Sequence, residues 1–347
     1  MIEPSLPLID LHRHLDGSVR LQTILELGQA HHLALPAWDI DGLRPHVQAT
    51  ANPAAGSLPG VMAFIAKFRW MTEVMVDYAA CRRIAFEGVE DAWREGLDYV
   101  ELRFSPWFMA ETHHLDPSGV VEAVVDGVSA AQRDLPMRAK LIGILSRTYG
   151  PEVAWSEMRA LLAHRDALVA LDLAGDEANW PGALFAEHIG RARAEGLQIT
   201  VHAGESAGPE SVWHALRELG ASRIGHAVSA SHDPELLDRL AADRIGVEVS
   251  LTSNVQTSTV PDYASHPLRH FVERGILATL NTDDPGISNI DLRHEYEVAA
   301  PAAGLTQAQI RQVQQNALEV AFLAEGERKD ILASREAKLR QNPSRTP

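Results

Sequence analysis

Eight short apolar runs, separated by amphipathic stretches, constrain the fold of this chain more than any other feature. The runs are Leu8–His12, Tyr99–Phe104, Leu141–Leu145, Leu168–Leu173, Ile199–His202, Ile224–His226, Gly246–Leu251 and Ile276–Asn281. Helical periodicity marks stretches between them, such as Ser118–Arg133, Glu152–His164, Pro181–Glu195, Pro209–Leu219, Pro234–Ala242 and Pro267–Arg274. Strands that alternate with helices in this way form a parallel sheet. Eight of them predict an α/β fold, a closed (β/α)8 barrel of the TIM type, with its active site at the carboxyl ends of the strands.

The main rival architecture is an open, doubly wound sheet. Such a sheet would be expected to carry a glycine-rich nucleotide loop directly after an early strand. Neither GxGxxG nor GxxxxGK[ST] occurs in the chain. The barrel is therefore the favoured fold.

Two regions of the chain lie outside the alternation. Residues 21–78 have the pattern of helices, clearest at Thr23–Gln29 and Pro59–Trp70, and we expect a helical insertion after the first strand that covers the barrel mouth. Leu305–Leu323 is expected to be a closing helix with Thr306 as its N-cap, so that the barrel ends in a helical extension. Because no repeat or linker divides the chain, we expect one domain over residues 1–340 and a polar tail at 341–347.

Composition narrows the class of partner. The formal net charge of −16 argues against duplex nucleic acid or an anionic membrane as the main partner, but it says little about a small neutral substrate. The single cysteine, Cys81, excludes an intrachain disulfide and suits a reducing compartment. The first ten residues lack the pattern of a signal peptide, and no apolar run approaches the ~20 residues that span a bilayer. We therefore expect a cytoplasmic protein.

Two histidines at the end of the first run are the first candidates for chemistry. His12 and His14 are two residues apart, so on a strand they point to the same side. At the carboxyl end of a barrel strand that side is the mouth, where two imidazoles can begin a metal site. By itself the pair is weak evidence, because the chain contains 16 histidines.

Later runs end in further groups that can bind a metal or move protons. His202 and Glu205 follow the fifth run, His226 ends the sixth, and Asp283 and Asp284 follow the eighth. Each has an ordinary alternative role, such as a core histidine or a helix N-cap. Four strand ends that each supply a histidine or a carboxylate make the joint pattern far more specific. Three imidazoles and one carboxylate would suit zinc with one open position for water.

The expected number of metal ions is one. Binuclear barrels of this kind often bridge their metals with a modified lysine at a strand end. The four lysines of this chain are Lys67, Lys140, Lys329 and Lys338, and none lies at the carboxyl end of a predicted strand. The zinc site of the cytidine deaminases needs a pair of cysteines, which this chain lacks.

The motifs together resemble the bacterial adenosine deaminases, which belong to the metal-dependent amidohydrolase barrels. The resemblance covers nearly the whole chain and rests on HRHLDGSVR (12–20), ELRFSP (101–106), LDLAGDE (171–177), VHAGE (201–205), RIGHA (223–227), LTSNVQTS (251–258) and NTDDP (281–285). It implies a zinc-dependent hydrolase of purine salvage that deaminates adenosine, and by extension 2′-deoxyadenosine, to inosine or 2′-deoxyinosine and ammonia. Ala227 departs from the family, which usually has glycine after the histidine of this motif.

The resemblance also implies the residues that bind the metal and activate water. His12, His14, His202 and Asp283 would hold one zinc ion, which lowers the pKa of a water molecule. His226 would orient this water and help to take its proton. Glu205, His226 and Asp283 would thus be the catalytic residues.

Other residues are implied in binding the nucleoside. Glu205 would protonate N1 of the purine, which requires a raised pKa. Asp284 would bond to N7, and the backbone N–H of Gly175 would reach N3, an approach that a side chain there would hinder. Asp16 would bind a ribose hydroxyl, and His14 would also lie beside the substrate.

Several alternatives remain open from the sequence. An adenine deaminase would act on the free base, and Asp16 is the discriminating position, because many base-specific relatives have Glu there. AMP is a weaker candidate, since no basic cluster lies near the motifs to bind a phosphate. A metal phosphoesterase would hold two or three metals, and a non-catalytic nucleoside-binding protein would be expected to lack Glu205, His226 or a metal ligand. The oligomeric state and the metal bound in the cell are also left open.

Overall fold

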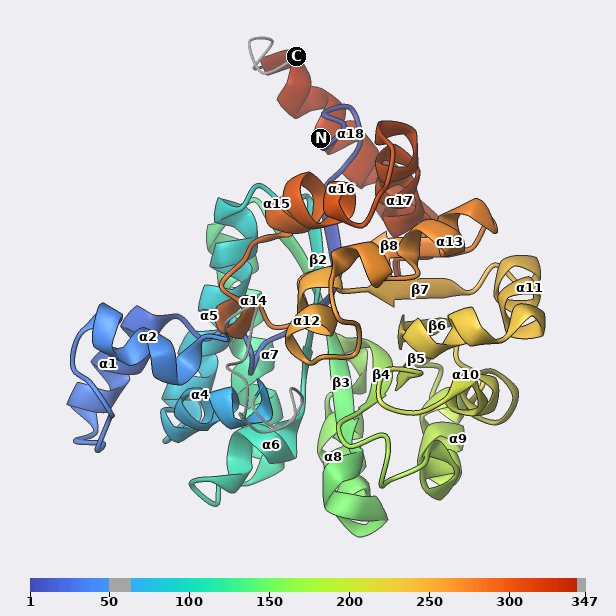
Figure 1. The fold of residues 1–347 in the computed structure, drawn as a ribbon. Helices are drawn as coiled ribbons and strands as arrows, with labels where there is room; N and C mark the ends of the chain where they lie inside the picture. The colour runs from blue at the N-terminus through green and yellow to red at the C-terminus, as the bar shows by residue number, and fades with distance from the viewer. Residues whose placement is uncertain (50–63, 342–347) are drawn as a thin grey trace.

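Eight parallel strands form a nearly closed barrel with helices around it (Figure 1). The structure is a computed structural model that describes residues 1–49 and 64–341. The strands follow one another around the barrel in chain order. They are β1 Ile9–His14, β2 Tyr99–Phe104, β3 Arg138–Ser146, β4 Leu168–Ala174, β5 Gln198–Ala203, β6 Arg223–His226, β7 Gly246–Val249 and β8 Leu277–Leu280. The predicted (β/α)8 barrel is confirmed.

The ends of β7 and β1 differ from the predicted runs, and for β7 the structure shows the reason. The seventh run was expected to continue to Leu251, but β7 ends at Val249. The carboxylate of Glu295 accepts hydrogen bonds from the backbone N–H groups of Leu251 and Thr252, at 2.9 and 3.1 Å. These contacts begin the short helix α12 (Leu251–Gln256) where a longer strand was expected. At the other side, β1 extends to His14, so both histidines of the first motif lie on the strand.

The helices between the strands match the predicted stretches closely. Pro209–Leu219 is α-helical at first and then forms a π-helical turn at Ala215–Leu219. The closing helix has the predicted N-cap, since Thr306 and Gln309 form a reciprocal capping box. The principal outer helices are α5 Tyr78–Arg94, α6 Pro106–Glu111, α7 Pro117–Asp134, α8 Gly150–Ala163, α9 Ala186–Ala194, α10 Pro209–His214, α11 Pro234–Ala242 and α13 Leu268–Glu273. After β8 come α14 Pro285–Ser288, α15 Leu292–His294, α16 Ala300–Ala302, α17 Gln307–Val320 and α18 Glu325–Gln341.

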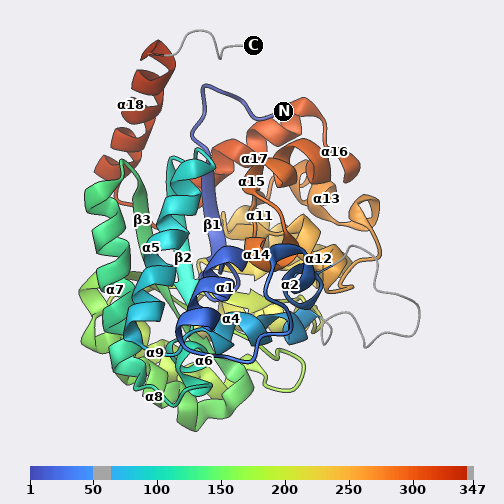
Figure 2. The same cartoon turned by 90° about the vertical axis from the view of Figure 1, so that its left-hand side faces the viewer.

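The described part of the insertion is helical and lies beside the barrel (Figures 1 and 2). It contains α1 Leu21–Ala30, α2 Ile40–Val47 and α4 Arg69–Glu73. Of the predicted helix Pro59–Trp70, residues 59–63 lie outside the described residues, and the remainder includes a 3-10 turn at Ala66–Phe68. After α2 the chain reaches α14, where the backbone N–H of Ala49 donates to the carbonyl of Ile287 at 2.8 Å.

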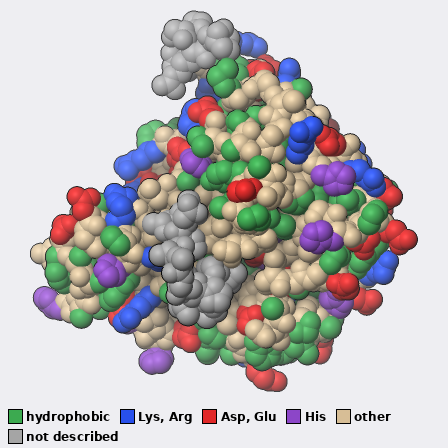
Figure 3. All heavy atoms as spheres, in the orientation of Figure 1, with side chains coloured by type: hydrophobic (Ala, Val, Ile, Leu, Met, Phe, Trp, Pro, Cys, Tyr) green, Lys and Arg blue, Asp and Glu red, His purple; other side chains and the backbone are tan. Residues whose placement is uncertain are grey.

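The last helix, α18, lies at the end of the barrel where the strands begin (Figure 2). Arg335 and Lys338 of this helix pair with Asp98, the residue before β2. The polar tail predicted at 341–347 begins at the end of α18, and residues 342–347 lie outside the described part of the chain. Within residues 1–49 and 64–341, no helix combines the length and the apolar character needed to cross a membrane. Hydrophobic, acidic and basic side chains are interspersed on the described surface in Figure 3.

Candidate active site

The barrel closes at the residues that the sequence singled out as metal ligands. Between β1 and β8 a parallel bridge joins Arg13 to Asp283. The backbone N–H of His14 donates to the carbonyl of Asp283 at 2.7 Å, and the N–H of Asp283 donates to the carbonyl of His12 at 2.8 Å. Closure of the barrel therefore holds three predicted ligands together through the backbone, before any side-chain contact is considered.

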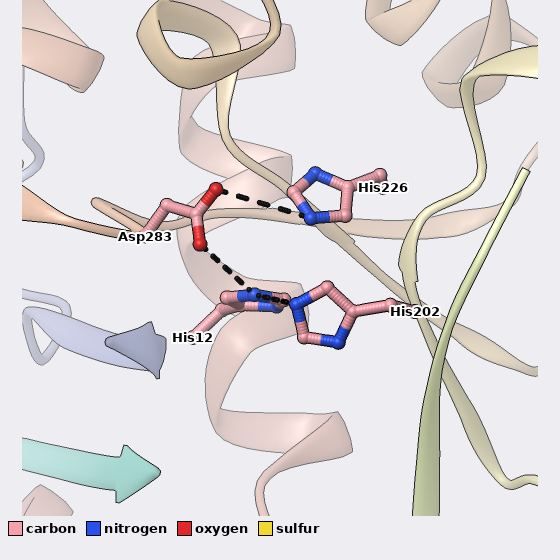
Figure 4. Close-up of side chains that lie close together, drawn as sticks. All are labelled: His12, His202, His226 and Asp283. Atoms are coloured by element: carbon pink, nitrogen blue, oxygen red, sulfur yellow. Dashed lines mark hydrogen bonds and ion pairs between the residues drawn. The ribbon is translucent and has the colours of Figure 1, made fainter. Parts of the chain in front are cut away.

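Side-chain donor atoms of the four predicted ligands converge on one point. His12 Nε2 lies 3.0 Å from His202 Nε2, and His14 Nε2 lies 3.3 Å from both of these atoms. Asp283 Oδ1 lies 3.2 Å from the Nε2 atoms of His12 and His14. His226, the last residue of β6, completes the cluster. Figure 4 shows its ring facing Asp283, above the rings of His12 and His202.

In two of these rings, the hydrogen bond made by the outer nitrogen determines that the inner nitrogen has a free lone pair facing the centre of the cluster. His12 Nδ1 lies 2.7 Å from Glu248 Oε2, and His202 Nδ1 lies 3.0 Å from a carboxylate oxygen of Asp172. A carboxylate requires a donor, so the ring proton lies on Nδ1 in both rings. Burial lowers the pKa of His12, and it lowers the pKa of His202 to about 3, so both rings are neutral. Their Nε2 lone pairs then point at each other, which only a shared cation or proton can stabilise.

The arrangement fits a metal ion. For zinc bonds of 2.0–2.1 Å, tetrahedral donors lie about 3.3 Å apart, close to the separations in this cluster. The electrostatic field also favours positive charge here. Burial alone would lower the pKa of His14, but the charges of Asp284, Asp283 and Asp16 outweigh it and raise that pKa to about 9. A buried group of histidines and a carboxylate that can bind a metal is therefore present at the predicted place.

An ionic layer lies beneath the cluster, inside the barrel, and its role was not predicted. Arg103 donates to Asp172 and to Glu248, both at 2.8 Å, so one guanidinium joins the two carboxylates that orient His202 and His12. Arg223 pairs with Glu248 as well. All of these side chains are fully or almost fully buried, and a buried charge is stable only when it is paired. The signal in the sequence is a charged residue within an otherwise apolar strand, as in the run GVEV.

His226 and Glu205 lie next to the cluster, where a reacting group could bind. His226 Nε2 is 3.6 Å from Glu205 Oε2 and 3.9 Å from Asp283 Oδ2. His226 and Asp283 both have positive φ angles, 65° and 61°, which residues with a side chain rarely adopt. Such backbone conformations concentrate at functional sites, because the surrounding structure must hold them in place.

The protein shifts the pKa values of the acidic residues of the site in different directions. Burial raises the pKa of Glu205 although its side chain is 22% exposed. Burial also raises the pKa of Asp284, and the charge of the adjacent Asp283 raises it further. Asp283 behaves in the opposite way, because His12, His14 and His226 hold its pKa well below the usual range despite its burial. The protein thus lowers the pKa of the carboxylate that faces the cluster and raises the pKa of its neighbour. The side chain of Asp284 makes no N-cap hydrogen bond to α14, the ordinary alternative for an aspartate before proline.

Asp16 and Gly175 lie on the same rim. Asp16 is buried, its Oδ1 has no hydrogen-bond partner within the described structure, and it lies 3.8 Å from His14 Nδ1. Gly175 follows β4 with a φ angle of 105°, and a Cβ atom there would lie 2.4 Å from Thr148 Oγ1. A side chain at position 175 is therefore excluded by both backbone conformation and space.

Glu177 organises the loop that carries Glu205, and the sequence reasoning did not single it out. Its carboxylate accepts four backbone N–H groups, from Gly204, Glu205, Ser206 and Ala207, at 2.6–3.1 Å. Successive N–H groups that point to one anion form a concave binding nest. Glu177 is buried, so water cannot replace it easily. The loop after β5 is thus held by a charge from the loop after β4.

Replacing Glu177 by Gln should disturb this loop. An amide oxygen can accept from fewer donors than a carboxylate, and the new NH2 group would face backbone N–H groups. We expect a loss of about 2–3 kcal/mol in the free energy of unfolding and a fall in kcat, measured by calorimetry and by steady-state kinetics. Glu210→Gln, in an exposed position just beyond the same loop, is the matched control. Equal melting temperatures for the two variants would contradict the role of Glu177.

Ala227 has a positive φ angle of 52° and is fully buried. In this conformation glycine is favoured over alanine by about 1 kcal/mol. Loss of the buried methyl group costs about 0.8 kcal/mol, so the two effects nearly cancel in Ala227→Gly. We expect its melting temperature to stay within a few degrees of the parent. Ala230→Gly is the control, because Ala230 is equally buried without a positive φ angle and should be clearly destabilised. Equal destabilisation of both variants would show that the backbone at Ala227 is not strained.

A family model described as adenosine deaminase matches residues 7–337. The chain belongs to the adenosine deaminase family. Among its relatives, an adenosine deaminase of Klebsiella pneumoniae is 58% identical over 332 residues, which cover 96% of this chain and 98% of the relative. The resemblance inferred from the motifs is thereby confirmed.

Solved structures of other proteins share the barrel fold of this chain. An adenine deaminase from Arthrobacter aurescens superposes with a TM-score of 0.87 at 21% identity, covering 96% of this chain and 99% of that one. An amidohydrolase from Burkholderia ambifaria with bound Zn gives a TM-score of 0.85 at 24% identity, over 98% and 92% of the two chains. At such identities the likeness concerns the barrel fold.

Proposed function

We propose that this protein hydrolyses adenosine to inosine and ammonia, and that it accepts 2′-deoxyadenosine as well. The observation that carries the proposal is a cluster of three imidazole nitrogens 3.0–3.3 Å apart, with Asp283 3.2 Å from two of them, in a chain of this family. The carboxyl of Glu205, whose pKa is raised, lies beside this cluster. The high identity to an adenosine deaminase over almost its full length supports the choice of substrate.

One zinc ion is proposed as the cofactor, held by His12, His14, His202 and Asp283. Neutral imidazoles and a carboxylate are suitable zinc ligands, and their outer hydrogen bonds to Glu248 and Asp172 would raise their basicity. When bound, the metal supplies Lewis acidity that makes water a nucleophile near neutral pH. Of the four lysines, Lys140 lies near the start of β3 and the other three lie on helical segments, which agrees with a mononuclear site.

The raised pKa values of two carboxyl groups would allow them to act as hydrogen-bond donors to a purine. The ring nitrogens N1, N3 and N7 of adenine are acceptors, so each requires a donor. A protonated Glu205 would donate to N1 and make C6 more electrophilic, and a protonated Asp284 would donate to N7. The backbone N–H of Gly175 would serve N3, and Asp16 would bind a ribose hydroxyl. His226, beside Glu205 and Asp283, would orient the attacking water on the face of C6.

A spectrophotometric assay tests the proposal against its alternatives. Adenosine, 2′-deoxyadenosine, adenine and AMP are compared at equal concentration, with and without a chelator, and the metal content of the protein is measured in parallel. We expect adenosine to be deaminated fastest, loss of activity on chelation, and about one zinc per chain. Faster turnover of adenine would overturn the ribose assignment of Asp16. A metal content clearly above one per chain, with phosphoester hydrolysis, would favour a phosphoesterase.

A further inference from the structure

A chain of buried polar side chains leads from His226 away from the active site. His226 Nδ1 lies 3.1 Å from Asn254 Nδ2, and Asn254 Oδ1 lies 3.2 Å from His266 Nε2. The backbone N–H of Leu268 donates to His266 Nδ1 at 3.0 Å. All three side chains are buried, so solvent offers them few alternative partners. These side chains must therefore serve as one another's hydrogen-bond partners along the whole series.

The hydrogen bond at the His266 end determines the direction of the other hydrogen bonds in this series. A backbone N–H can only donate, so His266 Nδ1 must be the acceptor and its ring proton must lie on Nε2. Burial lowers the pKa of His266 to about 3, which agrees with a neutral ring that carries a single proton. His266 Nε2 then donates to Asn254, and the atom of Asn254 that faces it must be the carbonyl oxygen.

A second contact agrees with this orientation of the Asn254 amide. Asn254 Nδ2 lies 3.4 Å from Glu205 Oε1, at the long limit of a hydrogen bond. If the amide were turned over, its oxygen would face this carboxyl oxygen and its NH2 group would face the proton on His266 Nε2. The contact with His266 would then bring two donors face to face. The amide nitrogen therefore faces His226, and His226 Nδ1 is an acceptor.

From this geometry we infer that Asn254 and His266 are positioning residues that hold Nδ1 of His226 as an acceptor and so keep the ring proton on Nε2. The inference rests on the proposed function, because it concerns the nitrogen that faces Glu205 and Asp283. His226 has the opposite tautomer to His12 and His202, whose Nδ1 atoms bear the proton. With an N–H at the reacting side, His226 holds the attacking oxygen as a hydrogen-bond donor. Before Nε2 could accept a proton, it would have to lose the one it carries.

The tautomer can be measured directly. Long-range proton–nitrogen NMR spectra of the enzyme as purified, labelled with 15N-histidine, distinguish protonated from unprotonated ring nitrogens, and the His226→Gln spectrum assigns the signals of His226. We expect His226 to carry its proton on Nε2, in contrast to His12 and His202. A proton on Nδ1 of His226 in the parent enzyme would overturn the inference. This result does not depend on turnover, so a failure of the proposed function with adenosine would be seen separately in the assay.

Two variants of His266 test the origin of the tautomer. His266→Leu removes the donor to Asn254 Oδ1, whereas His266→Gln can still place an N–H there. We expect the Leu variant to show mixed tautomers at His226 and to lose roughly ten- to a hundredfold in kcat with little change in KM. The Gln variant should retain the Nε2 tautomer and most of the rate. An unchanged His226 tautomer in a folded Leu variant would show that His266 does not set it. Loss of the Nε2 tautomer in both variants would contradict the donor role of position 266.

Discussion

Glu205→Gln is expected to lower kcat for adenosine by roughly a hundred- to ten-thousandfold, the usual contribution of a general acid. The substitution preserves the size of the side chain but removes the proton that Glu205 would give to N1. No atom of Glu205 belongs to the cluster of donor atoms that lie 3.0–3.3 Å from one another, so the metal should remain bound. The measurement is kcat by ultraviolet absorbance, with zinc content determined on the same sample.

The two readouts separate the possible causes of a loss. Inactive protein with a full complement of zinc supports the proton-donor role of Glu205. Activity close to that of the parent would show that another group protonates the purine. Glu210→Gln, at an exposed position in the same segment, should leave kcat unchanged.

His12→Ala is expected to remove both the metal and the activity. It deletes a donor atom at the centre of the cluster and leaves the carboxylate of Glu248 without one of its partners. Loss of several kcal/mol of Lewis-acid stabilisation corresponds to at least about a thousandfold in rate. Metal content after dialysis and kcat are the measurements. His270→Ala, which alters an exposed histidine of α13, is the control. A variant of His12 that retained stoichiometric zinc would remove His12 from the ligand set.

Much of the fold and many of the site residues could be predicted because the relevant signals are local. Apolar runs a few residues long reveal the strands, and a parallel barrel brings all their carboxyl ends to one rim. His12, His202, His226 and Asp283 could be placed together on that basis alone, and the structure brings them within 4.8 Å of one another. The individual roles of these residues remain proposals, as does the single domain over residues 1–340.

Other features depend on partners that are distant in the sequence. Arg103 and Glu248 are 145 positions apart, and their pairing follows from the way the strands face each other across the barrel interior. The same holds for Glu177, whose effect on the loop at 204–207 appears only when two loops are folded side by side. The end of β7 was also misjudged, because the residue that begins α12 there, Glu295, lies more than 40 positions later.

The ionic layer beneath the histidines has a consequence for protein design. Arg103 holds Asp172 and Glu248 in place, and these hold the rings of His202 and His12. A designer who transferred only the four candidate ligands to another barrel would transfer the donor atoms without the groups that aim them. Loss of such outer partners commonly weakens metal affinity by about ten- to a hundredfold. The smallest transplantable unit of this site is therefore the cluster together with its buried arginine and carboxylates.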